Sequence, residues 1–238
     1  MIFNFEERLS DSSFVERIWR THSERTGDFL SVAASQWEMV VSRYNGETTM
    51  TVRGPETKAT PLHVTLVGGE FFGIIFKHGT VMPSLPASNL VDGDVDLPDA
   101  SSKSFWLNGS AWQFPNYGNA DTFVDRLVRE GLLVRDPVVE SALRDEPQEL
   151  SPRSVQRRFL QATGLTQGSI RQIERARYAT MLLQGGVSIL DTVDLTGYAD
   201  QAHLTRALKY LIGKTPTQII RKSEPEQMSL LFKTTSFS

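Results

Sequence analysis

The sequence predicts an α+β protein in which a small N-terminal β-barrel precedes an all-helical C-terminal domain. Three observations lead to this class. Short β-rich runs separated by glycine and asparagine turns fill the first half of the chain. Apolar residues at helical spacing, bounded by capping residues, fill the second half. The halves also differ in charge: residues 1–150 hold 13 Lys and Arg against 22 Asp and Glu, whereas residues 151–222 hold 11 against 4.

The composition is that of an ordinary folded protein, and a length of 238 residues favours two domains. The sequence has no cysteine, which excludes disulfides, thiolate catalysis and cysteine-ligated zinc. No apolar run is long enough to cross a bilayer, and the acidic start MIFNFEERLSD does not resemble a signal peptide. We therefore expect a cytoplasmic protein without membrane attachment. The basic third of the chain indicates a module that binds a polyanion, with chance surface variation as the alternative.

Residues 1–118 are predicted to form the barrel, with a β-sandwich as the alternative. The runs MVVSRY and TTMTVR flank Asn45-Gly46, a dipeptide typical of two-residue hairpins. The segments LHVTLVGG and EFFGIIFKHGT continue the strand pattern, and their glycines lie at expected turns. We expect the aromatic residues of SFWLNGSAWQFP to pack in the core rather than to cage a ligand.

Residues 119–136 are predicted to form a connecting helix. Asp121 lies near its start, Gly131 lies just past its end, and an apolar stripe lies between them, formed by Phe123, Val124, Leu127 and Val128. Such a stripe packs inside its own domain or forms a dimer seam.

Residues 137–223 are predicted to be helical throughout, and residues 224–238 to be a flexible tail. After a helix in DPVVESALRD, Ser151 and Pro152 start a second helix that Gly164 ends. A long helix over 169–184 follows. Ser188 then caps a helix that turns at Gly197 into a last amphipathic one, whose buried stripe is predicted to be Leu204, Leu208 and Leu211.

This order of helices predicts two helix-turn-helix units joined by the long helix. The second helix of each unit carries side chains that can bond base edges and phosphates, since Arg pairs with guanine and Gln with adenine. The alternative is that these are merely solvated helix faces. The predicted DNA-binding residues are Ser151, Arg153, Ser154, Gln156 and Arg157 in the first unit and Gln201, Ala202, Thr205, Arg206 and Lys209 in the second. Arg158 shares the surface of the first unit.

At these residues the chain resembles the AraC family of bacterial transcriptional regulators. The resemblance rests on GYADQAHLTR followed by GKTP, on LSPRSVQRRF, and on Arg175, Ala179, Leu182 and Leu183 of the joining helix. It covers about residues 137–222 and implies base contacts from six residues, namely Arg153, Gln156, Arg157, Gln201, Thr205 and Arg206. It further implies phosphate contacts from Ser151 and the last helix N-terminus, with Asp200 as a cap and His203 as a structural hydrogen-bonder.

The sequence departs from this family in two places. The turn RDEPQE is longer than usual, and Val193 stands where the family has a small alanine for close helix crossing. Both departures affect the tilt of the reading helices. More weakly, the N-terminal half resembles the cupin-like sensory barrel of some family members, which implies a small-molecule effector and dimerisation.

The resemblance makes double-stranded DNA the expected partner, with RNA polymerase, an unidentified effector and a second copy of the chain as further candidates. The alternative function is a barrel enzyme or small-molecule-binding protein whose helical domain is only an interaction module. His22, His63 and His78 are scattered without ligand spacing, and no phosphate-binding or hydrolase motif is present. We therefore expect no catalytic residue, no metal and no cofactor.

Overall fold

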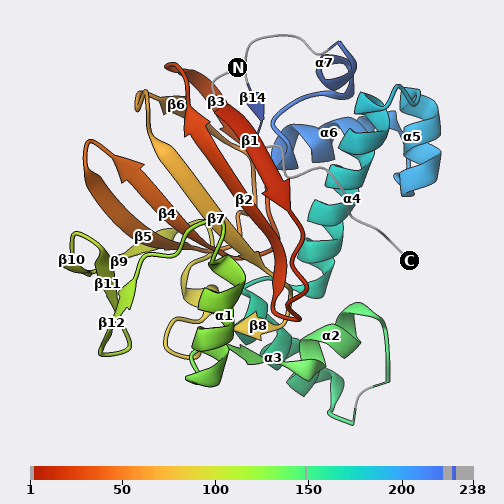
Figure 1. Ribbon diagram of the computed structural model, residues 1–238. Helices are drawn as coiled ribbons and strands as arrows, with labels where there is room; N and C mark the ends of the chain where they lie inside the picture. Colours follow the sequence, from red (N-terminus) through yellow and green to blue (C-terminus); the bar gives the residue numbers. More distant parts are fainter. Residues whose placement is uncertain (1–2, 148, 222–226, 229–238) are drawn as a thin grey trace.

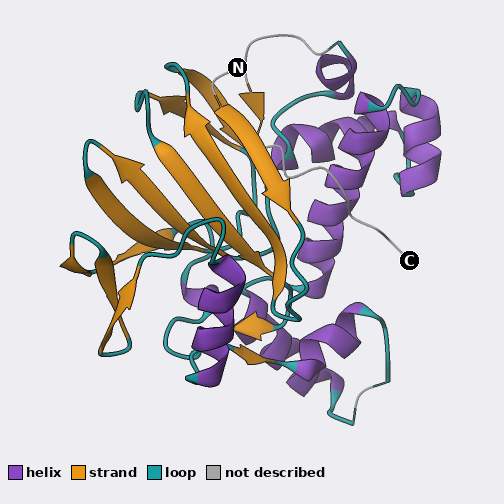
Figure 2. Cartoon of the chain, in the orientation of Figure 1, coloured by secondary structure: helices purple, strands orange, loops and turns teal. Residues whose placement is uncertain are grey.

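The computed structural model describes residues 3–147, 149–221 and 227–228. It has strands in its N-terminal half and helices in its C-terminal half, so the predicted α+β class is confirmed (Figures 1 and 2). The predicted tail over 224–238 lies outside the described residues except for Gln227–Met228. In the described part of the chain no helix is long and apolar enough to cross a membrane.

The main sheet has six antiparallel strands in the order β1-β2-β7-β4-β5-β9. Asn45 and Gly46, both with positive φ, make the predicted hairpin between β4 and β5. A smaller sheet with the order β14-β3-β6 packs near its β1 end. The strands are β1 (Phe3–Arg8), β2 (Val15–Ser23), β3 (Gly27–Ser31), β4 (Glu38–Tyr44), β5 (Glu47–Arg53), β6 (Thr60–Val64), β7 (Glu70–Phe76), β9 (Asp94–Leu97) and β14 (Gln227–Met228).

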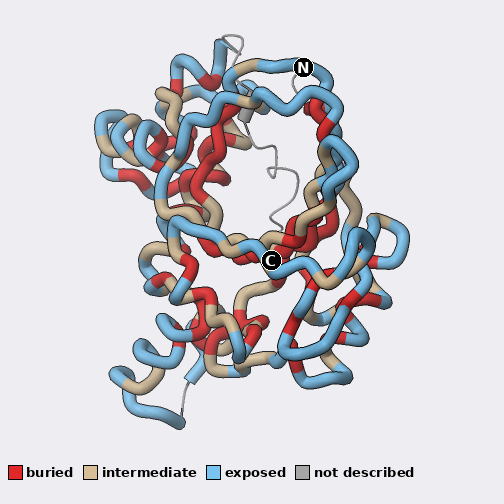
Figure 3. The backbone as a smooth tube through the Cα atoms, turned by 90° about the vertical axis from the view of Figure 1, so that its left-hand side faces the viewer, coloured by how far each residue is buried: buried red, intermediate tan, exposed pale blue. Residues whose placement is uncertain are grey.

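These two sheets run around a ring when the chain is seen end-on (Figure 3). Among the described strands no ladder joins β1 to β9, so the six-stranded sheet itself is open. The cupin-like assignment stays a prediction. Two further ladders complete the β structure: β10 (Asp99–Ser101) with β11 (Ser104–Leu107) and β12 (Ser110–Gln113), and β8 (Thr80–Val81) with β13 (Val134–Arg135).

One face of the six-stranded sheet is buried under β11, β12 and helix α1 (Ala120–Arg129). Phe105 and Trp112 are buried there as expected, whereas Trp106 of the same segment is exposed, which the sequence did not predict. In the α1 stripe Phe123, Val124 and Leu127 are buried and Val128 is half-buried, and the stripe packs against this core. The stripe therefore contributes to this core. The predicted connecting segment is helical only as far as Arg129, because Val134 and Arg135 pair with β8.

The C-terminal half contains six helices in its described residues. They are α2 (Pro137–Leu143), α3 (Pro152–Thr163), α4 (Gln167–Gln184), α5 (Ile189–Thr196), α6 (Gln201–Leu211) and α7 (Pro216–Ile220), and a 3-10 turn, η1 (Ala87–Asn89), lies beside α3. In Figure 1, α4 has α2 and α3 near one end and α5, α6 and α7 near the other. The helical core also contains Leu30, Val32 and Ala33 from the N-terminal half. The two halves therefore share this helical core, which is separate from the core under the six-stranded sheet.

Candidate nucleic-acid interface

The first helix-turn-helix unit ends in α3, whose start is fixed by local chemistry. The Ser151 hydroxyl accepts the Ser154 backbone N–H at 3.3 Å, and Pro152 takes the first helical position, where no N–H is needed. Gly164 ends the helix in the left-handed conformation at φ 75°. The predicted cap, first residue and stop are all confirmed.

The exposed side of α3 carries the reading residues predicted for this unit. Arg153, Gln156 and Arg157 are exposed and have no hydrogen-bond or ion-pair partner within the described residues, whereas Ser154 is half-buried. Phe159 is buried. The structure thus leaves two guanidinium groups and one amide free for a ligand on a single helix.

Two further side chains of this unit make contacts inside the chain. Val155 is half-buried and packs at the margin of the helical core. Arg158 donates through Nε to Asp136 Oδ2 at 2.7 Å, an ion pair that ties α3 to the residue capping α2. Arg158 therefore serves packing within the unit rather than the reading face.

The second unit places α6 after a tight turn. Gly197 adopts φ 67°, a conformation that costs an ordinary L-residue steric strain, and Asp200 Oδ1 accepts the His203 N–H at 2.6 Å. The predicted cap at Asp200 is confirmed. Leu204, Leu208 and Leu211 are all buried, as the sequence predicts. The His203 ring packs edge-on against Tyr198 at 5.1 Å.

The outward side of α6 carries the second set of predicted residues. Gln201, Ala202 and Arg206 are exposed, and no partner is found for the Arg206 guanidinium within the described chain. The Thr205 hydroxyl donates to the Gln201 carbonyl at 2.8 Å, so its donor is used inside the helix. Lys209 Nζ donates to the Gly213 carbonyl at 3.2 Å and thereby neutralises the helix C-terminus.

Helix α4 separates the two units and is fixed to the second one by a contact that the sequence did not reveal. The Arg175 guanidinium lies over the Tyr198 ring at 4.4 Å, and Tyr198 is buried behind the turn at Gly197. Burial raises the pKa of the Tyr198 hydroxyl. With 18 residues, α4 is about 27 Å long, close to the length of one turn of DNA, about 34 Å.

Comparison with known proteins gives the class of this region. A helix-turn-helix domain family matches residues 149–222. The chain is also 35% identical over 88 residues to the HTH-type transcriptional regulator RipA of Corynebacterium glutamicum. Residues 149–222 are an AraC-type helix-turn-helix domain.

The match to RipA covers 36% of this chain and 27% of RipA, so it spans about a quarter of that protein's length. No solved structure matches the chain significantly. The family match begins at residue 149, which leaves α2 outside the AraC-type domain as matched. It includes every predicted DNA-binding residue from Ser151 to Lys209.

Beside the AraC-type domain, the N-terminal half holds a narrow cavity of about 100 Å³ between its two sheets. Its apolar walls include Trp19, Phe29 and Ile75, and its polar groups include Glu56 and Arg177. Arg177 belongs to α4, so one wall of this cavity is part of the AraC-type domain. Burial raises the pKa of the Glu56 carboxyl, which accepts a hydrogen bond from Ser31 at 2.6 Å.

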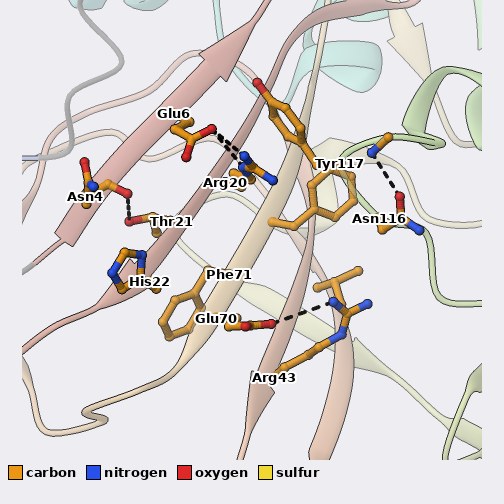
Figure 4. A pocket seen from close by; sticks show the side chains of 13 residues that line it. Asn4, Glu6, Arg20, Thr21, His22, Arg43, Glu70, Phe71, Asn116 and Tyr117 are labelled. Carbon is orange, nitrogen blue, oxygen red and sulfur yellow. Dashed lines mark hydrogen bonds and ion pairs between the residues drawn. The ribbon is translucent and has the colours of Figure 1, made fainter.

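A second hollow, of about 460 Å³, is polar and more open (Figure 4). Its arginines are already engaged: Arg20 forms two hydrogen bonds to Glu6 and lies over the Tyr117 ring, and Arg43 is 4.0 Å from Glu70. It touches no residue of the AraC-type domain.

Proposed function

We propose that the chain is a sequence-specific DNA-binding transcriptional regulator that inserts α3 and α6 into successive major grooves. The observation that carries this proposal is the arrangement of two capped helices whose N-terminal halves expose Arg and Gln side chains. Arg can form bidentate hydrogen bonds to guanine and Gln to adenine. The proposed reading residues are Arg153, Gln156, Arg157, Gln201, Thr205 and Arg206.

Phosphate contacts belong to a second set of residues in this proposal. Ser151 stands at the N-terminus of α3, where free N–H groups and the helix dipole favour an anion. Ser154, which is half-buried, and Ala202, which is exposed, are proposed to approach the sugar-phosphate backbone. The Lys209 ammonium group exchanges the Gly213 carbonyl for a DNA phosphate as its hydrogen-bond acceptor and so contributes positive charge.

The test starts from a random pool of duplexes, from which the full chain selects its preferred sequence at low salt. Binding to that duplex is then measured by fluorescence anisotropy across a salt series. We expect one sequence to be enriched and log affinity to fall linearly with log salt, because neutralised phosphates release counterions. Failure to enrich any sequence would reject the proposal and favour a barrel enzyme or binding protein whose helices serve only as an interaction module.

A small molecule bound in the 100 Å³ cavity is proposed to modulate this activity. The cavity wall formed by Ser31 and Val32 continues into Ala33, which hydrogen-bonds the end of α6, and Arg177 brings α4 to the same space. A ligand that moved this wall would act on both helices at once. Dimerisation through the N-terminal half and contact with RNA polymerase stay predictions.

A thermal-shift screen of a metabolite collection tests the cavity. A bound compound raises the melting temperature of the wild-type chain by mass action. It should leave the variant Ile75→Phe unmoved, because the larger side chain fills the space, while the exposed control Trp106→Phe responds as the wild type does. Stabilisation that persists in Ile75→Phe would place the ligand elsewhere.

A further inference from the structure

The C-terminal end of α6 is held by the N-terminal half of the chain. The backbone N–H of Ala33 donates to the Leu211 carbonyl at 2.8 Å, and that of Ala59 donates to the Tyr210 carbonyl at 3.0 Å. The last carbonyls of a helix have no partner inside the helix, so two distant loops here complete the end of α6. A Cβ on Gly213 would lie 2.7 Å from Leu30 Cδ2, which shows how closely these segments approach.

The C-terminal end of α3 meets another part of the same half. A Cβ on Gly164 would lie 2.7 Å from Val91 Cγ2 and 2.9 Å from the Ala87 carbonyl oxygen. Only glycine permits this approach, because real Cβ atoms do not come so near. The end of α3 is therefore seated on η1 and the residues that follow it.

Both recognition helices are thus attached in the same way. Their C-terminal ends are seated on the N-terminal half, while their N-terminal halves, which carry Arg153, Gln156, Gln201 and Arg206, are exposed. Helix-turn-helix proteins contact bases with the N-terminal residues of the recognition helix. The attached C-terminal ends are therefore not the ends that contact bases.

We propose that residues Leu30–Ala34, Ala59 and Ala87–Val91 form a common mount that fixes the distance and orientation between α3 and α6. The mount thereby determines the spacing that the chain accepts between two half-sites on DNA, one bound by α3 and the other by α6. This inference rests on the proposed function for its consequence on DNA, but the mount itself concerns the free protein. Ala33, Ala59 and Val91 are positioning residues in it.

Helix α4 alone does not define this geometry. It fixes the separation along its own axis, but α3 joins it through the short segment Gly164–Thr166. Rotation of α3 about that segment is limited by its contacts with α2, with η1 and with β8. Rotating a recognition helix by even a fraction of a turn displaces its side chains from the base edges, so this restraint bears directly on spacing.

The first test measures the distance between the helices in the free protein. Because the chain has no cysteine, the double variant Gln161→Cys/Tyr210→Cys takes two spin labels at exposed positions of α3 and α6 only. Double electron–electron resonance should give one narrow distance distribution that an added duplex leaves unchanged. A broad distribution that narrows only with DNA would overturn the mount.

The second test loosens one attachment in that same labelled chain. Val91→Asp places a carboxylate against the negative end of α3, whereas Val91→Thr keeps the shape without the charge. We expect Val91→Asp to broaden the distribution and Val91→Thr to leave it narrow. A narrow distribution in a folded Val91→Asp chain would overturn the role of this contact. If Val91→Asp does not fold, the distance distribution of the labelled wild-type sequence still decides whether the mount fixes the distance between α3 and α6.

The third test uses duplexes in which the two half-sites of the selected sequence are moved apart. Inserting about 5 base pairs turns them to opposite faces of the helix. The wild type should lose at least about tenfold in affinity, equivalent to about 1.4 kcal/mol, and Val91→Asp much less. Equal tolerance in both would overturn the spacing role. Absence of any duplex binding would instead reject the proposed function, and the distance distribution would still decide the mount.

Discussion

Replacing Asp200 separates its capping role from any role in reading bases. Its Oδ1 accepts the His203 N–H at 2.6 Å, at the first turn of α6. Loss of an N-cap costs about 1 kcal/mol, and loss of a negative charge at a helix N-terminus costs about 0.3–1 kcal/mol more. Asp200→Ala loses both contributions. Asp200→Asn keeps the acceptor and loses only the charge.

For a chain of this size, 1 kcal/mol corresponds to about 2–4 °C in melting temperature. Calorimetry should therefore find Asp200→Ala about 3–8 °C below the wild type and Asp200→Asn within about 4 °C of it. Both variants should bind DNA more tightly at low salt, by similar factors, because each removes a negative charge from the end of α6 that the proposed complex brings to the DNA. Equal destabilisation of the two would refute the cap. Selective loss of preference at one base pair in Asp200→Asn would show that Asp200 reads a base.

Three more outcomes follow from individual side chains. Arg206→Ala should cost about 1–3 kcal/mol on the selected duplex and relax preference at one base position, whereas Lys209→Ala should weaken all duplexes alike in the same anisotropy assay; a uniform loss in both would mean that α6 presents another face. Leu204→Ala should lower the free energy of unfolding by about 2–5 kcal/mol in a denaturant titration, since Leu204 is fully buried, and a smaller loss would show that its site collapses. Burial raises the folded-state pKa of Glu56 above 4.5, so the folded state holds its proton longer and stability falls as pH rises above that value. Glu56→Gln, which cannot ionise, should therefore be more stable than the wild type at pH 7 but not at pH 4, and a gain of equal size at both values would assign the effect to packing.

The helix ends were predictable because each depends on a few neighbouring residues. Ser151, Ser188 and Asp200 cap helices, and Gly164 and Gly197 end them, all as the sequence indicates. The start of α4 was placed two residues late. There Thr166 is the cap, accepting the Ser169 N–H at 3.0 Å, while the expectation began the helix at Ser169 itself.

Long-range partners had no comparable signal. Arg158 has the same character in the sequence as Arg157, yet it is held by Asp136, 22 positions away. Its partner depends on how the chain folds back between the two residues, which neither periodicity nor capping encodes. The same holds for backbone contacts such as Ala33 with Leu211, across 178 positions of the chain.

The attachment of the recognition helices determines where the acidic and basic regions of the chain lie relative to the two ends of these helices. The acidic first 150 residues contain the mount, which contacts the C-terminal ends of α3 and α6. The free basic side chains Arg153, Arg157 and Arg206 lie in the first half of α3 and at the middle of α6. A helix N-terminus is itself the positive end of the helix dipole. Side-chain charge, helix dipole and repulsion from the acidic half therefore all favour binding of a polyanion at the free ends of α3 and α6. Such a field raises the rate of productive encounter in a salt-dependent way. The sequence alone shows that the chain has an acidic region and a basic region. The attachment of the C-terminal ends of α3 and α6 explains why both regions favour a polyanion at the free ends of these helices.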